Sequence, residues 1–281
     1  MLEQSHGLAN SALEAITGLE RRVVVADGGR LKLEWGTLRS RPADEVRDLL
    51  WWEDGCLLGF LAIYGFNWDH LELTGMVDPD ARRRGIGRAL FDAALPLCRQ
   101  QEKERLLMVV PRTSPSGESF ARGYGMSFDH SEHALTLRQR PDWVPSDGVI
   151  ELRAATTDDI PLLSRLYDDG FHDGGRVDPS RLASDRSRTL LIVRDDEAVG
   201  TIALSQDGAQ GAIYAFVVGS AWRGRGIGGE ALRRACLELF DAGSEHVDLE
   251  VEVENDHALG LYTSTGFQLE ATDDYYELIL R

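Results

Sequence analysis

One stretch of the chain combines glycines and arginines in a pattern suited to binding an anion. It reads Arg223-Gly224-Arg225-Gly226-Ile227-Gly228-Gly229, and it follows an apolar segment, 213–218, that we expect to be a strand. Apolar residues then recur at helical spacing, at positions 227, 231, 235 and 239. First-turn N–H groups of a helix have no intrahelical acceptor, and the helix dipole places partial positive charge there. We therefore expect this turn to hold a phosphate or pyrophosphate, with Arg223 and Arg225 adding charge.

A second copy of the pattern lies 141 residues earlier, as Arg82-Arg83-Arg84-Gly85-Ile86-Gly87-Arg88 after a short apolar segment that ends at Val77. An internal repeat of this size predicts two domains. The placement differs from a dinucleotide fingerprint, which lies in the first βαβ unit with an acidic residue about twenty positions on. The Gly-Lys-Ser/Thr of a P-loop is also missing.

Charge and composition narrow the class of protein. The net charge is −17, which argues against nucleic acid as a partner. Residues 1–145 hold 18 basic and 21 acidic residues, whereas 146–281 hold 12 and 26, so the second half carries most of the negative charge. That charge either attracts a cationic amine or only keeps the protein soluble. The three cysteines lack metal-ligand spacing, and no apolar run would span a bilayer; we expect a cytoplasmic protein without metal or membrane contact.

The residues downstream of the later turn complete a known pattern. Thirty-two residues after Arg223 comes Asn255-x-x-Ala258-x-x-x-Tyr262-x-x-x-Gly266-Phe267. This combination resembles the GNAT superfamily of acyl-CoA-dependent N-acyltransferases, over nearly all of the second half and most of the first. The resemblance implies an α/β fold, with a mixed sheet and helices on both faces, in two tandem domains. We place the N-terminal domain at 1–140 and the C-terminal domain at 146–281, joined by a segment that contains Pro141 and Pro145.

The order of expected elements agrees with this fold. In the first half we expect a helix at 8–22, strands at 31–35, 46–52, 57–64, 71–77, 106–110 and 134–137, and helices from the first turn to 99 and at 117–123. In the second half we expect a strand at 149–153, a helix capped by Thr156 or Thr157, a loop at 168–178, strands at 190–194, 198–204, 213–218, 247–253 and 275–280, and helices after the turn and at 256–264.

The resemblance assigns acetyl-CoA as the co-substrate and a primary amine of a small molecule or peptide as the acceptor. It implies that backbone of one strand pairs with the pantetheine arm, that an amide there serves as oxyanion donor, and that Asn255 braces the arm. The residues expected to bind the donor are Val217, Val218, Arg223, Gly224, Arg225, Gly226, Ile227, Gly228, Gly229 and Asn255, and in the first half Val77, Arg82, Arg83, Arg84, Gly85, Ile86, Gly87 and Arg88.

Two residues are expected to carry the proton transfers. Family members place a tyrosine near the CoA sulfur, and Tyr262 occupies that position as the acid for the departing thiolate. In strand 247–253, period-two spacing puts Asp248, Glu250, Glu252 and Glu254 on one face. Glu250 matches the base of the ribosomal-protein alanine acetyltransferase branch. The alternatives are that Tyr262 only packs its helix, that the acidic face is only solvated, or that ordered water near Tyr214 takes the proton.

The first half keeps the turn but loses the other groups. The offset matches Asn255 to Ser114, Glu250 to Val109 and Tyr262 to Ala121. We therefore expect a degenerate N-terminal domain and a catalytic C-terminal one, as in tandem members of the superfamily that acetylate the cysteinyl amine of a pseudodisaccharide thiol. Alternatives are an acyl-CoA sensor without turnover, transfer to an alcohol, or a longer acyl donor. The protein is expected to be a monomer or a homodimer.

Overall fold

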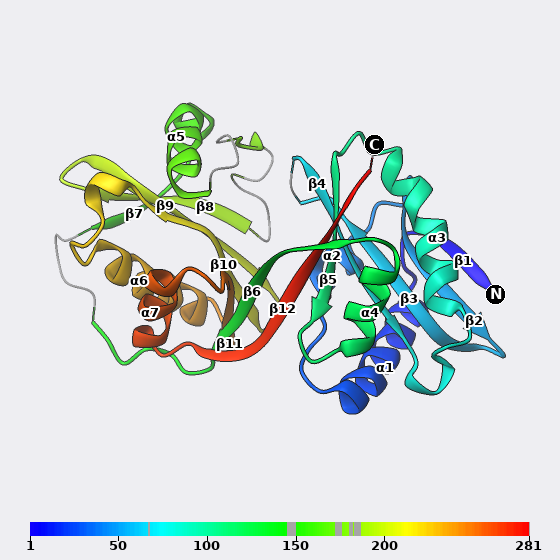
Figure 1. Ribbon diagram of the computed structural model, residues 1–281. Helices are drawn as coiled ribbons and strands as arrows, with labels where there is room; N and C mark the ends of the chain where they lie inside the picture. The colour runs from blue at the N-terminus through cyan, green and yellow to red at the C-terminus, as the bar shows by residue number, and fades with distance from the viewer. Residues whose placement is uncertain (67, 145–149, 172–175, 180–181, 183–186, 281) are drawn as a thin grey trace. The chain divides into compact units, whose positions relative to one another are not determined.

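The computed structural model describes residues 1–66, 68–144, 150–171, 176–179, 182 and 187–280 (Figure 1). The chain has an α/β fold and forms two compact units. The N-terminal unit consists of Met1–Glu132 together with Ala271–Arg281, and the C-terminal unit of His133–Glu270. Both units place helices on the two faces of a mixed sheet, as the resemblance implied.

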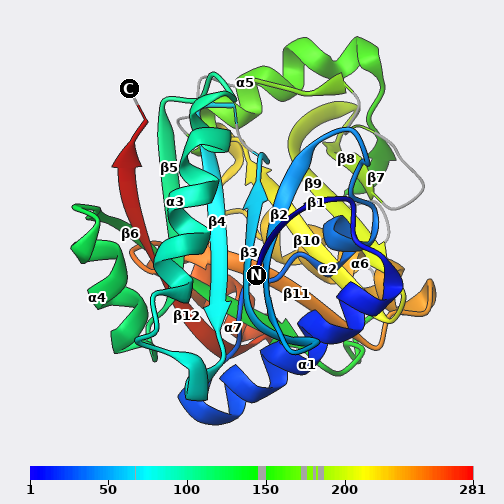
Figure 2. The ribbon, with the colours of Figure 1, turned by 90° about the vertical axis from the view of Figure 1, so that its right-hand side faces the viewer.

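In the N-terminal unit the strand order is β1-β2-β3-β4-β5-β12-β6, with β4 and β5 parallel. Figure 2 shows α3 lying along the strands. The strands are β1 (Leu2–His6), β2 (Val46–Glu53), β3 (Cys56–Tyr64), β4 (His70–Val77), β5 (Arg105–Pro111), β6 (Ser127–Leu137) and β12 (Gln268–Ile279). The helices are α1 (Asn10–Asp27), α2 (Trp35–Arg39), the 3₁₀ turn η1 (Pro79–Ala81), α3 (Ile86–Arg99) and α4 (Pro115–Gly123).

The C-terminal unit repeats this plan, with the strand order β12-β6-β11-β10-β9-β8-β7 and with β10 and β11 parallel. Its further strands are β7 (Glu151–Ala154), β8 (Ser187–Arg194), β9 (Glu197–Asp207), β10 (Gln210–Val218) and β11 (His246–Glu252). Its helices are η2 (Thr157–Asp159), α5 (Ile160–Phe171), η4 (Ser220–Trp222), α6 (Ile227–Asp241) and α7 (Asp256–Thr265).

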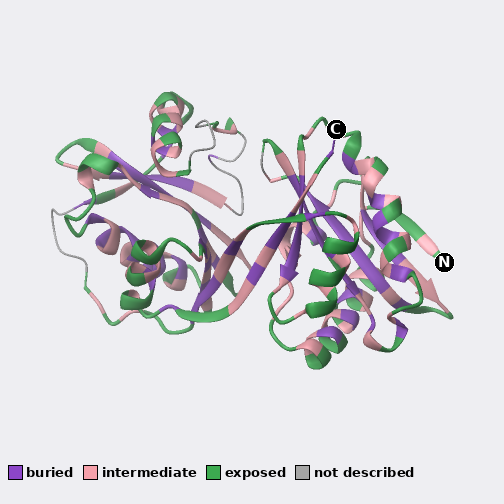
Figure 3. Cartoon of the chain, in the orientation of Figure 1, coloured by how far each residue is buried: buried purple, intermediate pink, exposed green. Residues whose placement is uncertain are grey.

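Each sheet is covered by a core on both faces, and its central strands are buried along much of their length (Figure 3). In the N-terminal unit, α3 and α4 pack with Leu71 and Leu73 of β4, while α1 and α2 pack with Met76 of the same strand and with β3. In the C-terminal unit, α6 and α7 form the larger cluster and α5 forms a smaller one on β8. Alternate residues of one strand thus face different cores, as the pleat requires.

The last strands of the two repeats serve both units. Residues 127–132 of β6 and 271–279 of β12 belong to the N-terminal unit, whereas 133–137 and 268–270 belong to the C-terminal unit. Within the N-terminal unit β12 pairs antiparallel with β5, from Asp273 opposite Pro111 to Ile279 opposite Arg105. The ranges predicted from the sequence, 1–140 and 146–281, assign each of these strands to one domain. They do not include the exchange of β6 and β12, by which each strand contributes residues to both units. The pattern of a strand shows that it pairs but not with which strand.

Most other expectations match the observed elements, with one clear error. The predicted strand at 31–35 is absent, because Leu33 N bonds Leu31 O and Trp35 N bonds Leu33 O in tight turns before α2. Its alternating apolar residues still pack under α1 and α2. Strand β1, which pairs with β2, was not anticipated. The predicted cap of the helix after β7 is a capping box between Thr156 and Asp159.

Candidate active site

The glycine-rich turn after β10 presents a row of backbone N–H groups. Gly224 and Gly226 have φ of 74° and 80°, the left-handed region that only glycine adopts without strain. Gly226 caps α6, whose first helical bond runs from Glu230 N to Gly226 O at 3.1 Å. Among the described residues, the N–H groups of 224–229 have no backbone acceptor. This arrangement is suited to an anion.

The N-terminal unit contains the same turn. Arg83 and Gly85 take φ values of 63° and 86°, and Gly85 caps α3 as Gly226 caps α6. Ala89 N donates to Gly85 O at 2.9 Å, which matches the first bond of α6. The offset of 141 residues read from the sequence therefore relates equal conformations.

The first arginine of each turn ties the turn to the strand before it. Arg223 Nε donates to Val218 O at 2.8 Å, and its guanidinium lies 3.3 Å from Asp169 Oδ2 in α5. Arg82 makes the same bond to Val77 O at 3.2 Å and a two-pronged pair with Asp27 of α1, at 2.8 and 2.7 Å. Both guanidinium groups are thus in contact with a carboxylate and help to position the turn.

Strand β10 is distorted where the sequence placed the pantetheine-binding backbone. Its register against β9 shifts between Tyr214 and Val217, and Ala215 has φ of 46°. Such a bulge bends the strand and re-aims the next side chains. The ladder between β10 and β11 ends at Ala212 opposite Asp248, so 213–218 carry no partner from β11. The strands separate at this point, and the backbone of Val217 and Val218 lies beyond the end of the ladder.

Tyr262 of α7 lies on the apolar side of this opening. Its ring centroid is 6.5 Å from that of Phe216, the residue displaced by the bulge, and 6.1 Å from that of Phe267. The residue is 8% exposed, and its hydroxyl makes no hydrogen bond to any described residue. Burial raises the pKa of Tyr262 to about 12. The phenol therefore stays protonated at neutral pH and has a proton to give.

The acidic residues of β11 do not share one role. Asp248 accepts hydrogen bonds from Thr136 Oγ1 at 2.5 Å and Gln210 Nε2 at 2.8 Å, which occupies it in holding strands together. Glu250 is half-buried and Glu252 is exposed on the same face. Glu254, which we expected on this face, lies in the turn beyond the end of β11. Glu250 thus lies half-buried between Asp248 and the exposed Glu252 on this face of β11.

Asn255 begins α7. Its Oδ1 accepts from Ala258 N at 3.1 Å, and Ser114 caps α4 in the same way by accepting from Gly117 N at 3.3 Å. The equivalence predicted by the offset therefore extends to the cap. The amide group of Asn255 also carries the donor Nδ2, whereas Ser114 has no second polar atom beside its capping oxygen.

The N-terminal unit holds a cavity of about 960 Å³ that follows its own turn. Its lining runs from Arg83, Gly85 and Gly87 past Val77 and Met108 to Arg30, in the loop before α2. The ladder between β4 and β5 ends at Leu73 opposite Met108, so these strands separate as β10 and β11 do. A cavity of this size would accommodate an extended cofactor arm.

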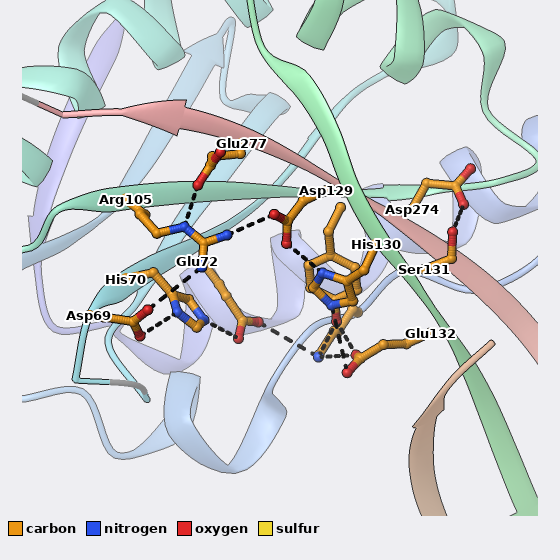
Figure 4. A network of polar contacts seen from close by, with 12 residues as sticks. Asp69, His70, Glu72, Arg105, Asp129, His130, Ser131, Glu132, Asp274 and Glu277 are labelled. Carbon is orange, nitrogen blue, oxygen red and sulfur yellow. Dashed lines mark hydrogen bonds and ion pairs between the residues drawn. The ribbon is translucent and has the colours of Figure 1, made fainter. Parts of the chain in front are cut away.

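A network of charged residues, which sequence reasoning missed, lies in the same unit (Figure 4). It joins β4, β5, β6 and β12 through short contacts, such as His70 Nδ1 to Asp69 Oδ1 at 2.8 Å and Arg105 to Asp129 at 2.7 Å. Ser131 donates to Asp274 at 2.7 Å. A signal was present in the alternation of His70, Glu72 and Thr74 with apolar residues along β4. No group of three or more candidate metal ligands occurs among the described residues. His172 lies outside them.

No helix in the described ranges is long and apolar enough to cross a membrane. The family model "Acetyltransferase (GNAT) family" matches residues 20–125 and again 156–267, which takes in both turns. The chain belongs to the GNAT acetyltransferase family. It is a tandem GNAT protein and an acyltransferase, and enzymes of this family use an acyl-CoA donor.

Curated relatives and solved structures agree with this assignment. A mycothiol acetyltransferase of Clavibacter michiganensis is 30% identical over 73% of this chain and 72% of its own length. One of Kytococcus sedentarius is 28% identical over 94% and 93%. A GCN5-related N-acetyltransferase of Sphaerobacter thermophilus has a TM-score of 0.74 at 20% identity, covering 95% and 92% of the chains. A tandem GNAT protein from the clavulanic acid biosynthesis pathway has 0.67 at 21%, covering 100% and 99%. These two structures share the fold.

Proposed function

We propose that the protein transfers an acetyl group from acetyl-CoA to a primary amine, and that the C-terminal unit carries out the reaction. The supporting observation is that three features meet in this unit: the anion-binding turn, the open edge of β10 beyond its bulge, and a buried protonated phenol at Tyr262. The N-terminal unit has the turn and a cavity, but Ala121 stands where the phenol would be.

Each group has one task in this proposal. The turn from Arg223 to Gly229 binds the pyrophosphate, and the N–H groups at the open edge of β10 line the pantetheine arm. An amide near Val217 and Val218 donates to the thioester oxygen as negative charge develops on it. Glu250 removes the ammonium proton, directly or through a water. Tyr262 protonates the thiolate as it leaves.

The acceptor is a cationic small molecule or a peptide N-terminus. The excess of acidic residues in 146–281 supports an amine that carries positive charge. The relatives named mycothiol acetyltransferase support a more specific candidate, the cysteinyl amine of a pseudodisaccharide thiol. The N-terminal unit, in this proposal, binds a second acyl-CoA without serving that acceptor.

The direct test is release of CoA thiol from acetyl-CoA with a panel of amines: polyamines, aminoglycosides, amino acids, short peptides and cysteinyl sugars. Turnover with one class identifies the acceptor, and turnover with the cysteinyl sugar alone selects the specific candidate. Binding of acetyl-CoA without release on any amine would contradict the proposal and favour an acyl-CoA sensor.

A further inference from the structure

The chain contains two lysines, Lys32 and Lys103, among 30 basic residues. The surroundings of the two differ. Lys103 is half-buried, and its Nζ donates to Trp68 O at 2.9 Å. The side chain of Lys32, in the loop before α2, is only 11% exposed. A protein in which 28 of the 30 basic residues are arginines therefore has a lysine whose side chain is largely shielded from solvent.

The Lys32 ammonium is surrounded by groups that would bind any primary ammonium. Nζ donates to the Tyr275 hydroxyl at 2.6 Å and lies 3.6 Å from Glu72 Oε2 and 3.6 Å from Glu132 Oε2. The Tyr275 hydroxyl in turn donates to Glu132. Figure 4 labels the two carboxylates, Glu72 and Glu132. Two carboxylates and a phenol thus converge on one amine.

Arginine would be the better residue for a purely structural ion pair at this position. Its planar guanidinium bonds carboxylates with two prongs and is more weakly hydrated than an ammonium, so it suits buried pairs. Lysine offers what arginine lacks, an amine that can lose its proton and act as a nucleophile. The choice of lysine here, in a chain so rich in arginine, points to the chemistry of the amine.

Lys32 lies beside the wall of the N-terminal cavity. Arg30 and Leu31, which precede it, line that cavity. So does Val109, which lies opposite Tyr275 in the ladder between β5 and β12 and packs with it. The ammonium and its partners therefore adjoin the region where β4 and β5 separate.

The hydroxyl of Thr74, on the same face of β4 as Glu72, supports the presence of a ligand near Lys32. Thr74 is 2% exposed and follows Glu72 by two residues, so it lies on the same face of β4. Its hydroxyl makes no hydrogen bond within the described part of the chain. A buried hydroxyl of this kind normally has a partner, and the carbonyl group of a bound thioester or amide would supply one.

We propose that Lys32 is an acylation site, and that the N-terminal unit transfers the acyl group of its bound acyl-CoA to this residue. Lys32 Nζ loses a proton to Glu132, directly or through Tyr275, and attacks the thioester carbon. A carbon–nitrogen bond forms, the carbon–sulfur bond breaks, and the CoA thiolate takes up a proton. The products are an Nε-acyl-lysine and free CoA. The inference rests on acyl-CoA binding in the N-terminal unit, which is part of the proposed function, and not on catalysis in the C-terminal unit.

The test is to incubate the full-length protein with acetyl-CoA, without any added amine, and to map acetylation by peptide mass spectrometry. We expect Lys32 to be acetylated faster than Lys103 by about tenfold or more, since a held amine and donor react as one molecule. The rate per chain should be unchanged when the protein is diluted. Glu132→Gln should slow the reaction at Lys32 and leave the slow reaction at Lys103 as it was. Lys32→Arg should abolish the fast phase, and Lys103→Arg should keep it.

Three results would overturn the inference. One is equal labelling of the two lysines, which marks uncatalysed chemistry. Another is an unmodified Lys32 in protein that binds two equivalents of acetyl-CoA. The third is binding of only one equivalent of acetyl-CoA, if this binding is lost in a Gly226→Val variant. That result would mean that the C-terminal turn binds the single acetyl-CoA and that the N-terminal cavity holds no donor. None of these results bears on CoA release with an external amine, so failure here and failure of the proposed function are distinguishable.

Discussion

The two anion-binding turns share their backbone conformation, but the strands that lead into them differ. In the N-terminal unit β4 pairs with β3 in unbroken register from Glu72 to Val77. In the C-terminal unit β10 is bulged at Ala215, and the bulge brings Phe216 to Tyr262. The comparison teaches that the same turn conformation forms with or without a bulge in the strand before it. In the proposed mechanism the turn binds the donor in both units, whereas the proton-transfer groups depend on the bulged strand and on the residues of the next strand and helix.

Removing the Tyr262 hydroxyl should have the largest effect, because only the C-terminal unit has a phenol at this position. In Tyr262→Phe we expect kcat to fall by about 10²-fold or more, because the thiolate loses its acid, while binding of acetyl-CoA changes little. Steady-state kinetics with the acceptor found in the panel, together with calorimetric binding, would measure this. Tyr276→Phe, a similar change on β12 within the N-terminal core, is the control. An unchanged kcat in Tyr262→Phe would remove the acid role.

The acidic strand offers a sharper comparison within one unit. Glu250→Gln should lower kcat by about tenfold to a hundredfold at neutral pH, because an amide cannot take up the proton of the ammonium group. Asp248→Asn should have the reverse signature, a lower unfolding temperature, because Asp248 accepts bonds from Thr136 and Gln210. If both variants lose only stability, the face is structural and the base lies elsewhere.

The helix caps test how far the donor sites are equivalent. Asn255→Asp keeps the cap on α7 but removes Nδ2, so the KM for acetyl-CoA should rise severalfold with stability retained. Ser114→Ala should cost about 1 kcal/mol of stability in the N-terminal unit, which a denaturant titration would record. An unchanged KM in Asn255→Asp would leave Asn255 with its capping role alone.

The smallest effect concerns acid stability. Hydrogen bonds from Arg153 and Thr156 hold the pKa of Asp159 well below its usual value, although burial opposes them. A carboxylate with a depressed pKa stabilises the fold above its unfolded pKa of about 3.8 and loses that contribution as the pH falls further. Asp159→Asn should therefore lower the stability of the C-terminal unit at neutral pH by about 1 kcal/mol and weaken its dependence on pH below 4. Parallel loss at all pH values would contradict the assignment.

The repeat, the family and most elements could be predicted from the sequence, because glycine turns and apolar periodicity are local signals. The different roles of the carboxylates on β11 could not be predicted. Asp248, Glu250 and Glu252 follow the same alternation, and only their neighbours distinguish them. The offset paired Asn255 with Ser114, and the structure shows that both residues cap a helix, a role that was not predicted. It gave no sign of the cluster around Lys32, because Glu132 and Tyr275 come from strands 143 residues apart.

The exchange of β6 and β12 has a consequence for biosynthesis. Residues Ala271–Arg281 complete the unit that begins at Met1. A chain emerging from the ribosome has therefore made all of β1 to β5 long before the strand that pairs with β5 exists. Until then β5 is an edge strand with unpaired backbone N–H and C=O groups. Such an edge is prone to aggregation, because strands of other chains can pair with it and chaperones must protect it. Domains usually fold in the order of their synthesis, but here the unit that contains β1 to β5 can finish folding only after β12, which follows the whole of the other unit in the chain, has been made.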